Sequence, residues 1–254
     1  MSDLDLLVAP ADLARARDLL RNEGYTDAFP GTDVRFWCNE MLLIRHDSQV
    51  AVDLHWELAP PHFRFMLDVA GFRARLRYVT IAGQPVATFS TDDLLIFLCL
   101  HGAKHGWSSL SWLCDLARLI DRNAIDWDAV FSYASSHRAS TILFLGVVLA
   151  SDLLGCELPL EVRHRCRSNR TATSLATAIR SQFCKHQHLR ARAIQFRLLE
   201  RTRDKVRMAL SFLKPDPFDL AELRLPATLF PVYYLTRPFR LVAKYARLVL
   251  SANR

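Results

Sequence analysis

Residues 2–8 read SDLDLLV, and this short stretch decides the fold. Side chains alternate between the two faces of an extended strand, so Asp3 and Asp5 share one face while the aliphatic residues Leu4, Leu6 and Val8 share the other. The stretch therefore predicts a strand with one apolar face for a core. Its other face carries two carboxylates roughly 7 Å apart along the strand.

A second strand, predicted at Val50–Trp56, carries a third carboxylate in the same kind of alternation. Asp53 shares a face with Ala51 and His55, whereas Val52, Leu54 and Trp56 point the other way. If the two strands are neighbours, Asp53 completes a triad with Asp3 and Asp5. Such a triad suits Mg²⁺ and two-metal phosphoryl or nucleotidyl transfer. The alternative is that these acids sit at a strand end without a catalytic role.

The pattern along the chain predicts an α+β protein: a small α/β part at about residues 1–90, then a larger helical part at 91–254. Strands are expected at Leu4–Val8, Val34–Cys38, Met41–His46 and Val50–Trp56, with a hairpin over 77–90 turning at Ala82-Gly83. Helices are expected at Ala11–Glu23, near Phe63–Phe72, after a capping box at Ser90–Asp93, and at Leu110–Asp121, Trp127–His137, Ala139–Leu154, Leu160–Cys166, Ala172–Lys185, Leu189–Arg201, Lys205–Leu213 and about Phe230–Leu250.

The composition and charge of the chain predict its redox state, its lack of membrane segments and its kind of partner. The chain has 254 residues, 51% of them hydrophobic, and six cysteines with no Cys-x-x-Cys pair. We expect buried free thiols in a reducing cytoplasm, no signal peptide, and no transmembrane segment, because the apolar runs are too short. Residues 1–159 have a net charge of −7 and residues 160–254 have +14. The basic part predicts either an anionic partner or a solvated face.

Three motifs in order carry a resemblance to a known family. They are Ser2–Val8, Val52–Trp56, and the segment 101–120, HGAKHGWSSLSWLCDLARLI. The chain resembles the nucleotidyltransferase superfamily that includes DNA polymerase beta, and more closely a bacterial nucleotidyltransferase-like family described as uncharacterised. Residues 224–241 also resemble that family's C-terminal region, so the resemblance runs from residue 2 to about 242.

The resemblance implies a mixed-sheet nucleotidyltransferase domain followed by a helical substrate-side domain. It implies that Asp3 and Asp5 bind both metal ions, Mg²⁺ or Mn²⁺, and that Asp53 is the third ligand. The implied reaction transfers a nucleoside monophosphate from an NTP to an unknown acceptor and releases pyrophosphate. A cleft between the two parts is expected to hold the acceptor, because ligand sites favour domain interfaces.

One departure from the family pattern concerns phosphate binding. Members carry a Gly-Ser or Gly-Gly pair upstream of the Asp-x-Asp strand, where helix amides bind the NTP phosphates. Here Met1 directly precedes Ser2. Either the start is misassigned and the chain is truncated, or the gene has been repurposed. For the chain as written, we expect weak or absent catalysis.

Five further residues are candidates for substrate binding: Ser2, His55, His101, His105 and Asp115. His55 shares a face with Asp53 and is a candidate to orient that carboxylate or the acceptor. The two histidines of 101–105 are one helical turn apart, which suits either a metal or phosphate contact, or a satisfied place in the core. Asp115 follows an apolar run, so we expect it to be buried and paired, for example with Arg118 at i+3.

The last predicted helix carries a basic stripe of Arg237, Arg240, Lys244 and Arg247. Such a helix suits an anionic membrane surface or nucleic acid, or packs with the stripe in solvent. The leading hypothesis is therefore a nucleotidyltransferase, cytoplasmic or peripheral at the membrane. The alternatives are a catalytically inactive module of the same fold that binds nucleic acid, acidic lipid or protein, and a structural partner encoded in a biosynthetic gene cluster.

Overall fold

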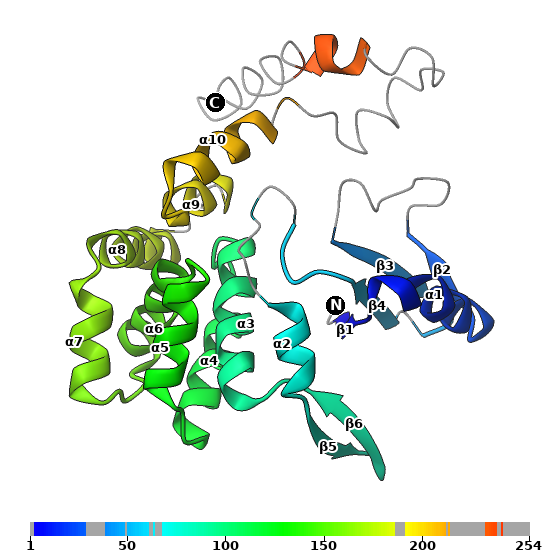
Figure 1. Cartoon of the computed structure of the whole chain (residues 1–254), viewed down its shortest axis with the longest axis horizontal. Helices are drawn as coiled ribbons and strands as arrows, with labels where there is room; N and C mark the ends of the chain where they lie inside the picture. Colours follow the sequence, from blue (N-terminus) through cyan, green and yellow to red (C-terminus); the bar gives the residue numbers. More distant parts are fainter. Residues whose placement is uncertain are drawn as a thin grey trace. The chain divides into compact units, whose positions relative to one another are not determined.

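The computed structural model describes residues 3–28, 39–48, 50–60, 63, 68–185, 191–211, 213, 232–237 and 240. Contacts divide the chain into two compact units, Met1–His62 with Arg203–Arg254, and Phe63–Thr202. The described residues form a small mixed sheet in the N-terminal part, followed by helices (Figure 1). This arrangement confirms the α+β fold class predicted from the sequence.

The first unit contains a four-stranded sheet in the order β1-β4-β3-β2. β1 (Asp3–Leu7) pairs in parallel with β4 (Val50–His55), and β3 (Glu40–Arg45) pairs antiparallel with both β4 and β2 (Tyr25–Asp27). The two acidic strands are therefore neighbours, as the triad hypothesis requires. β2 was not predicted, and the strand expected at Val34–Cys38 lies outside the described residues.

One face of this sheet packs against a helix. The chain leaves β1 through the short helix η1 (Pro10–Asp12) and enters α1 (Leu13–Asn22). Apolar side chains from the helix and the sheet form one cluster: Leu6, Val8, Leu13, Ala16, Leu20, Tyr25, Met41, Leu43, Leu54 and Trp56. The cluster confirms the predicted apolar face at Leu6, Val8, Leu54 and Trp56, whereas Leu4 is 55% exposed and lies outside the cluster. By alternation, Asp5 and Asp53 lie on the opposite face.

The second unit is built around a buried helix. α6 (Ser140–Leu154) is almost wholly buried and contacts α3, α4, α5, α7 and α8. In the part of the chain that the structure describes, the sheet is followed by α2 (Val69–Ala74), α3 (Thr91–Lys104), α4 (Leu110–Arg122), α5 (Trp127–Ser136), α6, α7 (Leu160–Ser168), α8 (Arg170–Lys185), α9 (Ala191–Leu198), α10 (Thr202–Ser211) and a helical segment at 232–237. No helix among the described residues has both the length and the apolar character needed to cross a membrane.

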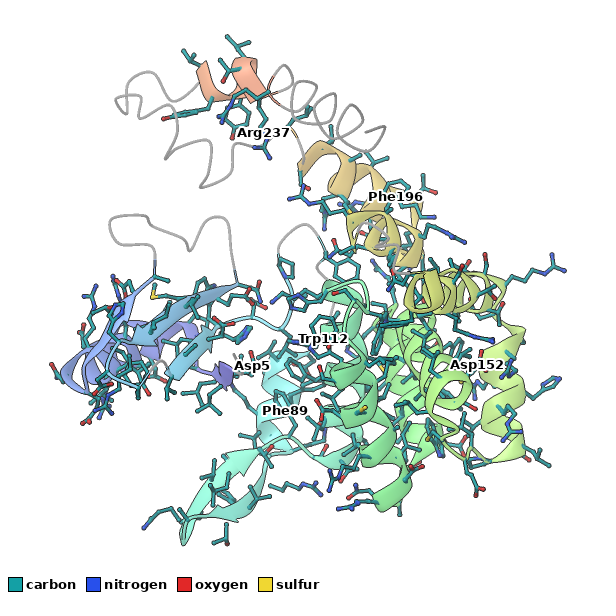
Figure 2. The ribbon with its side chains drawn as sticks, turned by 180° about the vertical axis from the view of Figure 1, so that it is seen from behind. Asp5, Phe89, Trp112, Asp152, Phe196 and Arg237 are labelled. Atoms are coloured by element: carbon teal, nitrogen blue, oxygen red, sulfur yellow. The ribbon has the colours of Figure 1, made fainter. Side chains whose placement is uncertain are left out.

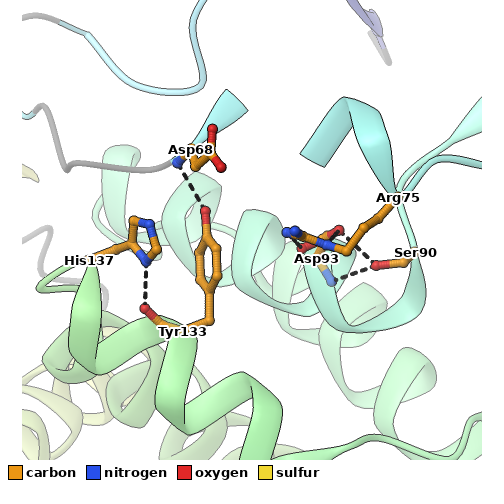
Figure 3. Close-up of polar contacts among 6 residues, drawn as sticks. All are labelled: Asp68, Arg75, Ser90, Asp93, Tyr133 and His137. Atoms are coloured by element: carbon orange, nitrogen blue, oxygen red, sulfur yellow. Dashed lines mark hydrogen bonds and ion pairs between the residues drawn. The ribbon is translucent and has the colours of Figure 1, made fainter. Parts of the chain in front are cut away.

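The sequence signals at the start of this unit are confirmed. β5 (Arg77–Ile81) and β6 (Gln84–Thr88) form an antiparallel hairpin, and both turn residues, Ala82 and Gly83, have positive φ (50° and 79°). One half of the capping box is also present, because the Ser90 hydroxyl accepts from the Asp93 amide at 3.2 Å. The Asp93 carboxylate in turn accepts two hydrogen bonds from Arg75 and one from the Ser90 hydroxyl (Figure 3).

The end of α3 explains the glycines of the 101–107 motif. Gly106 has a φ of +65°, and the Trp107 amide donates to the Gly102 carbonyl at 2.8 Å, which is the closing pattern of a Schellman turn. The turn folds the buried Trp107 indole back over the helix. A Cβ at Gly102 would lie 2.4 Å from the indole ring, and a Cβ at Gly106 would lie 2.8 Å from the Ala191 backbone. The glycines are thus required by packing.

Gly102→Ala is expected to lower the free energy of unfolding by about 1–2 kcal/mol. Overpacking a core costs about 1–3 kcal/mol, and the better helix propensity of alanine returns part of that. Gly71→Ala in α2 is the matched control, since its added Cβ would meet flexible ends of the Asp68 and Arg75 side chains. Urea unfolding of both variants measures the difference. Equal midpoints for the two variants would contradict the packing role of Gly102.

The described cysteine thiols are free, and three of them are buried: Cys99, Cys156 and Cys166. Burial raises the pKa of the Cys156 and Cys166 thiols to about 12, so both stay protonated and unreactive. The expectation of buried thiols is wrong for Cys114, which is exposed on α4. Cys38 and the Cys184 side chain lie outside the described residues.

The C-terminal helix is described only in part. Residues 232–237 are helical, while most of the helix expected at about Phe230–Leu250 lies outside the described residues. Arg237 is only 7% exposed. The expectation of a basic stripe in solvent is therefore wrong for Arg237. Arg240 is half-buried, and Lys244 and Arg247 lie outside the described residues.

Candidate functional site

Two carboxylates lie side by side on the face of the sheet that α1 does not cover. Asp5 in β1 is the register partner of Asp53 in β4, and in-register residues of paired strands point to the same side. Asp5 is exposed and Asp53 is half-buried. Like charges at directly opposed positions repel. The fold therefore holds two acids together at an electrostatic cost that a bound cation would relieve.

A buried histidine contacts the first of these acids. His55 follows Asp53 by two residues on the same face of β4, and its Nε2 lies 2.8 Å from Oδ1 of Asp5 (labelled in Figure 2). The His55 side chain is 7% exposed, whereas that of Asp5 is 36% exposed. Because a carboxylate accepts hydrogen bonds, the His55 Nε2–H is the donor. Our hypothesis had paired His55 with Asp53 or the acceptor, and the observed hydrogen bond goes to Asp5.

The other ring nitrogen of His55 faces two polar residues at the start of β3. Nδ1 lies 3.3 Å from Oε2 of Glu40 and 3.4 Å from the amide nitrogen of Asn39. Asn39 is 2% exposed, and its amide also donates to the Glu57 carbonyl at 3.1 Å. The imidazole thus contacts the buried Asn39 and the half-buried Glu40 through Nδ1, while Nε2 donates to Asp5.

The donor set fits a divalent cation. Within the part of the chain that the structure describes, the only group of three possible metal-binding residues is Asp5, Asp53 and His55, whose candidate ligand atoms all lie within 4.8 Å of one another. Carboxylate oxygens are the ligands that Mg²⁺ prefers, and Mn²⁺ accepts both oxygen and imidazole. The site therefore has the chemistry for one of these ions.

The remaining predicted site residues fall in different places. Asp3 occupies the first position of β1, in register with Ala51, but its side chain lies outside the described residues, as does all of Ser2. Asp115 is exposed on α4, so the expectation of a buried, paired acid is wrong. The apolar run before it fills the core through Leu113 instead.

His101 and His105 form an aromatic cluster on the second unit. Their rings are 4.7 Å apart, and both pack against Trp112 (labelled in Figure 2) with centroid distances of 5.7 and 5.0 Å. Each histidine is half-buried. Both histidines therefore pack against Trp112 while part of each residue stays exposed to solvent.

Sequence reasoning missed Asn39 and Glu40. A signal for Glu40 was present, because the strands predicted at Met41–His46 and Val50–Trp56 are joined by only three residues, and so short a connection fixes how they pair. That pairing places Glu40 opposite His55, on the same face. Nothing in the local pattern indicated Asn39, whose contacts depend on how the chain enters β3.

The sheet presents carboxylates of adjacent strands on the face opposite its core, an arrangement that suits metal-dependent phosphoryl or nucleotidyl transfer. The model of the uncharacterised nucleotidyltransferase family matches residues 1–155, well over half of the chain. The chain therefore belongs to this nucleotidyltransferase family. The match includes all three motifs that carried the resemblance and ends before residues 224–241. Neither the curated proteins nor the solved structures contain a significant match.

Proposed function

We propose that this chain is a divalent-metal-dependent nucleotidyltransferase that uses an NTP as its donor substrate. The observation that carries the proposal is the placement of Asp5 and Asp53 in register on adjacent parallel strands, opposite the core face. Family membership supports the reaction class. The acid pair supports the requirement for Mg²⁺ or Mn²⁺, and we assign metal binding to Asp5 and Asp53, with Asp3 as a further ligand.

The proposed reaction is a substitution at the α-phosphorus of the NTP. An acceptor oxygen bonds to that phosphorus, the bridge to the β-phosphate breaks, and pyrophosphate leaves while the acceptor hydroxyl loses its proton. A divalent ion at this site supplies neutralisation of phosphate charge and a more acidic hydroxyl. The chain's own contribution is to hold Asp5 and Asp53 at fixed positions on a packed sheet, which avoids reorganisation during the reaction.

We further propose that the segment 1–90 is the nucleotide-binding part and that 91–254 serves the acceptor. His101 and His105 are our candidates for contacts to the acceptor or to phosphate, because each ring keeps a partly exposed edge. Ser2 and the exposed Asp115 are weaker candidates of the same kind. The acceptor's chemistry is left to experiment.

The test is label transfer from NTPs labelled at the α-phosphate, each incubated with the full chain, Mn²⁺ or Mg²⁺, and a cell extract as acceptor source. We expect weak but metal-dependent pyrophosphate release with at least one NTP, lost on addition of EDTA. Thermal unfolding with Mn²⁺ and each NTP provides a second readout, since a bound ligand raises Tm. No release and no stabilisation, together with salt-sensitive RNA or lipid binding, would favour the inactive binding module instead.

A further inference from the structure

The contacts behind the acid pair form a chain of polar groups that starts in the interior and ends at an exposed carboxylate. The buried Asn39 and the half-buried Glu40 face Nδ1 of His55, and Nε2 of His55 faces Asp5. We propose that His55 is a positioning residue that fixes the orientation of Asp5 for metal binding. This inference rests on the proposed function.

The sheet geometry shows why a histidine is suited to this role. The register partner of His55 on β1 is Leu7, so Asp5 is its diagonal neighbour. Diagonal positions are about 7–8 Å apart, which only a long or aromatic side chain bridges. His55 reaches back along the sheet to Asp5 at 2.8 Å. One carboxylate oxygen of Asp5 is thereby held in place beside Asp53, its register partner.

The imidazole is itself held in one orientation. With Nε2 donating to Asp5, Nδ1 lies 3.4 Å from the amide nitrogen of Asn39 and 3.3 Å from Oε2 of Glu40, so polar side chains also contact the far side of the ring. The backbone around His55 is pinned as well, because its carbonyl accepts from the Val8 amide at 2.8 Å.

Burial separates this role from that of a direct ligand. His55 and Asn39 are 5% and 2% exposed, while Asp5 meets solvent. Orienting groups that lie behind the ligands of a metal are commonly buried in this way, and removing one costs about 10–100-fold in metal affinity. A direct ligand would instead present its own nitrogen to the ion.

The test measures Mn²⁺ binding to the full chain by electron paramagnetic resonance, with and without a non-hydrolysable NTP analogue. His55→Phe is expected to weaken Mn²⁺ binding about 10–100-fold. His55→Gln, whose side-chain amide keeps a donor, is expected to recover most of that loss. His46→Gln is the matched control, since His46 lies in the turn directly after β3, is exposed, and is hydrogen-bonded to Thr26. It is expected to bind Mn²⁺ like the unaltered chain. Urea midpoints of all variants identify any loss caused by unfolding.

A spectroscopic signature separates positioning from ligation. Electron spin-echo modulation of bound Mn²⁺ detects a directly coordinated nitrogen, and we expect none from His55. A nitrogen signal that disappears in His55→Gln would make His55 a ligand, overturning this inference and leaving the proposed function intact. Equal affinity of the folded His55→Phe variant would also overturn it. If the unaltered chain binds no Mn²⁺ under either condition, the proposed function falls as well.

Discussion

Asp53→Asn is expected to abolish Mn²⁺-dependent NTP binding and nucleotidyl transfer while leaving the fold equally or more stable. The amide keeps the shape of the carboxylate but removes one of two negative charges held in register with each other. A hard cation loses a charged oxygen ligand, so binding fails. Relief of the repulsion with Asp5 is expected to raise the free energy of unfolding by about 0.2–1 kcal/mol.

Asp53→Asn is expected to lose metal binding but not stability, and this combination distinguishes the loss of a ligand from damage to the fold. Loss of activity through general damage to the sheet would lower stability, whereas loss of a metal-binding charge would not. Asp47→Asn is the matched control, because Asp47 lies in the turn between β3 and β4 with 64% of its side chain exposed. The measurements are Mn²⁺ titration, label transfer and urea unfolding of both variants. Metal binding retained by Asp53→Asn would contradict the assignment of Asp53 as a ligand.

The parts of the site that the sequence predicted are those set by alternation within a strand. Side chains alternate along each strand, so the sequence predicts which face of the sheet carries Asp5 and Asp53. The apolar residues that alternate with them in each strand predict which face packs against α1. That β1 and β4 are neighbours is a tertiary fact. The two strands are separated by more than forty residues, so the triad remained a conditional statement until the pairing was observed.

Local signals also predicted the start of the helical unit. The Ala82-Gly83 turn and the Ser90 half of the capping box each depend on residues within a few positions of one another, and both are observed. Such features are determined by backbone preferences and short-range hydrogen bonds. The exposed Asp115 shows where this reasoning fails, because an apolar stretch of sequence does not reveal which side of α4 meets the core.

The contact between His55 and Asp5 was beyond sequence reasoning for a similar reason. Alternation placed His55 with Asp53, and the two do share a face. The hydrogen bond instead follows the direction in which the imidazole leans, diagonally to the next strand. That direction depends on the partners behind the ring, Asn39 and Glu40, which no local pattern connects to His55.

Arg75→Met is expected to lower the free energy of unfolding of the second unit by about 2–3 kcal/mol. Asp93 is 4% exposed at its side chain and accepts from Arg75 Nε at 3.0 Å and Nη2 at 2.8 Å. Removing one partner of a buried ion pair costs about 3–5 kcal/mol, because the remaining charge is left in the interior. Arg75 is 46% exposed, so water screens the remaining charge and the expected cost falls below that range, to about 2–3 kcal/mol.

Part of the expected loss of stability in Arg75→Met comes from lost packing. The Arg75 guanidinium lies 5.7 Å from the Phe72 ring centroid and 5.6 Å from that of Tyr133. Arg75, at the end of α2, thus contacts Asp93 in the first turn of α3 and Tyr133 in α5 (Figure 3). The Tyr133 hydroxyl also accepts from the Asp68 amide at 2.9 Å, next to the start of α2. Methionine retains much of the apolar stem but loses both hydrogen bonds and the contact of the cation with the rings.

Asp93 is buried and Arg75 is half-exposed, so the two single variants of this ion pair are expected to lose different amounts of stability. Asp93→Asn leaves a half-exposed guanidinium that water can solvate, so its cost is expected to be smaller, about 1 kcal/mol. Arg118→Met, on the exposed side of α4, is the control, with an expected change within 0.5 kcal/mol. Urea unfolding of the single variants and of the double variant gives the coupling between Arg75 and Asp93. A larger loss for Asp93→Asn than for Arg75→Met would show that the Asp93 carboxylate acts mainly as the cap of α3, rather than as a buried charge that needs its arginine.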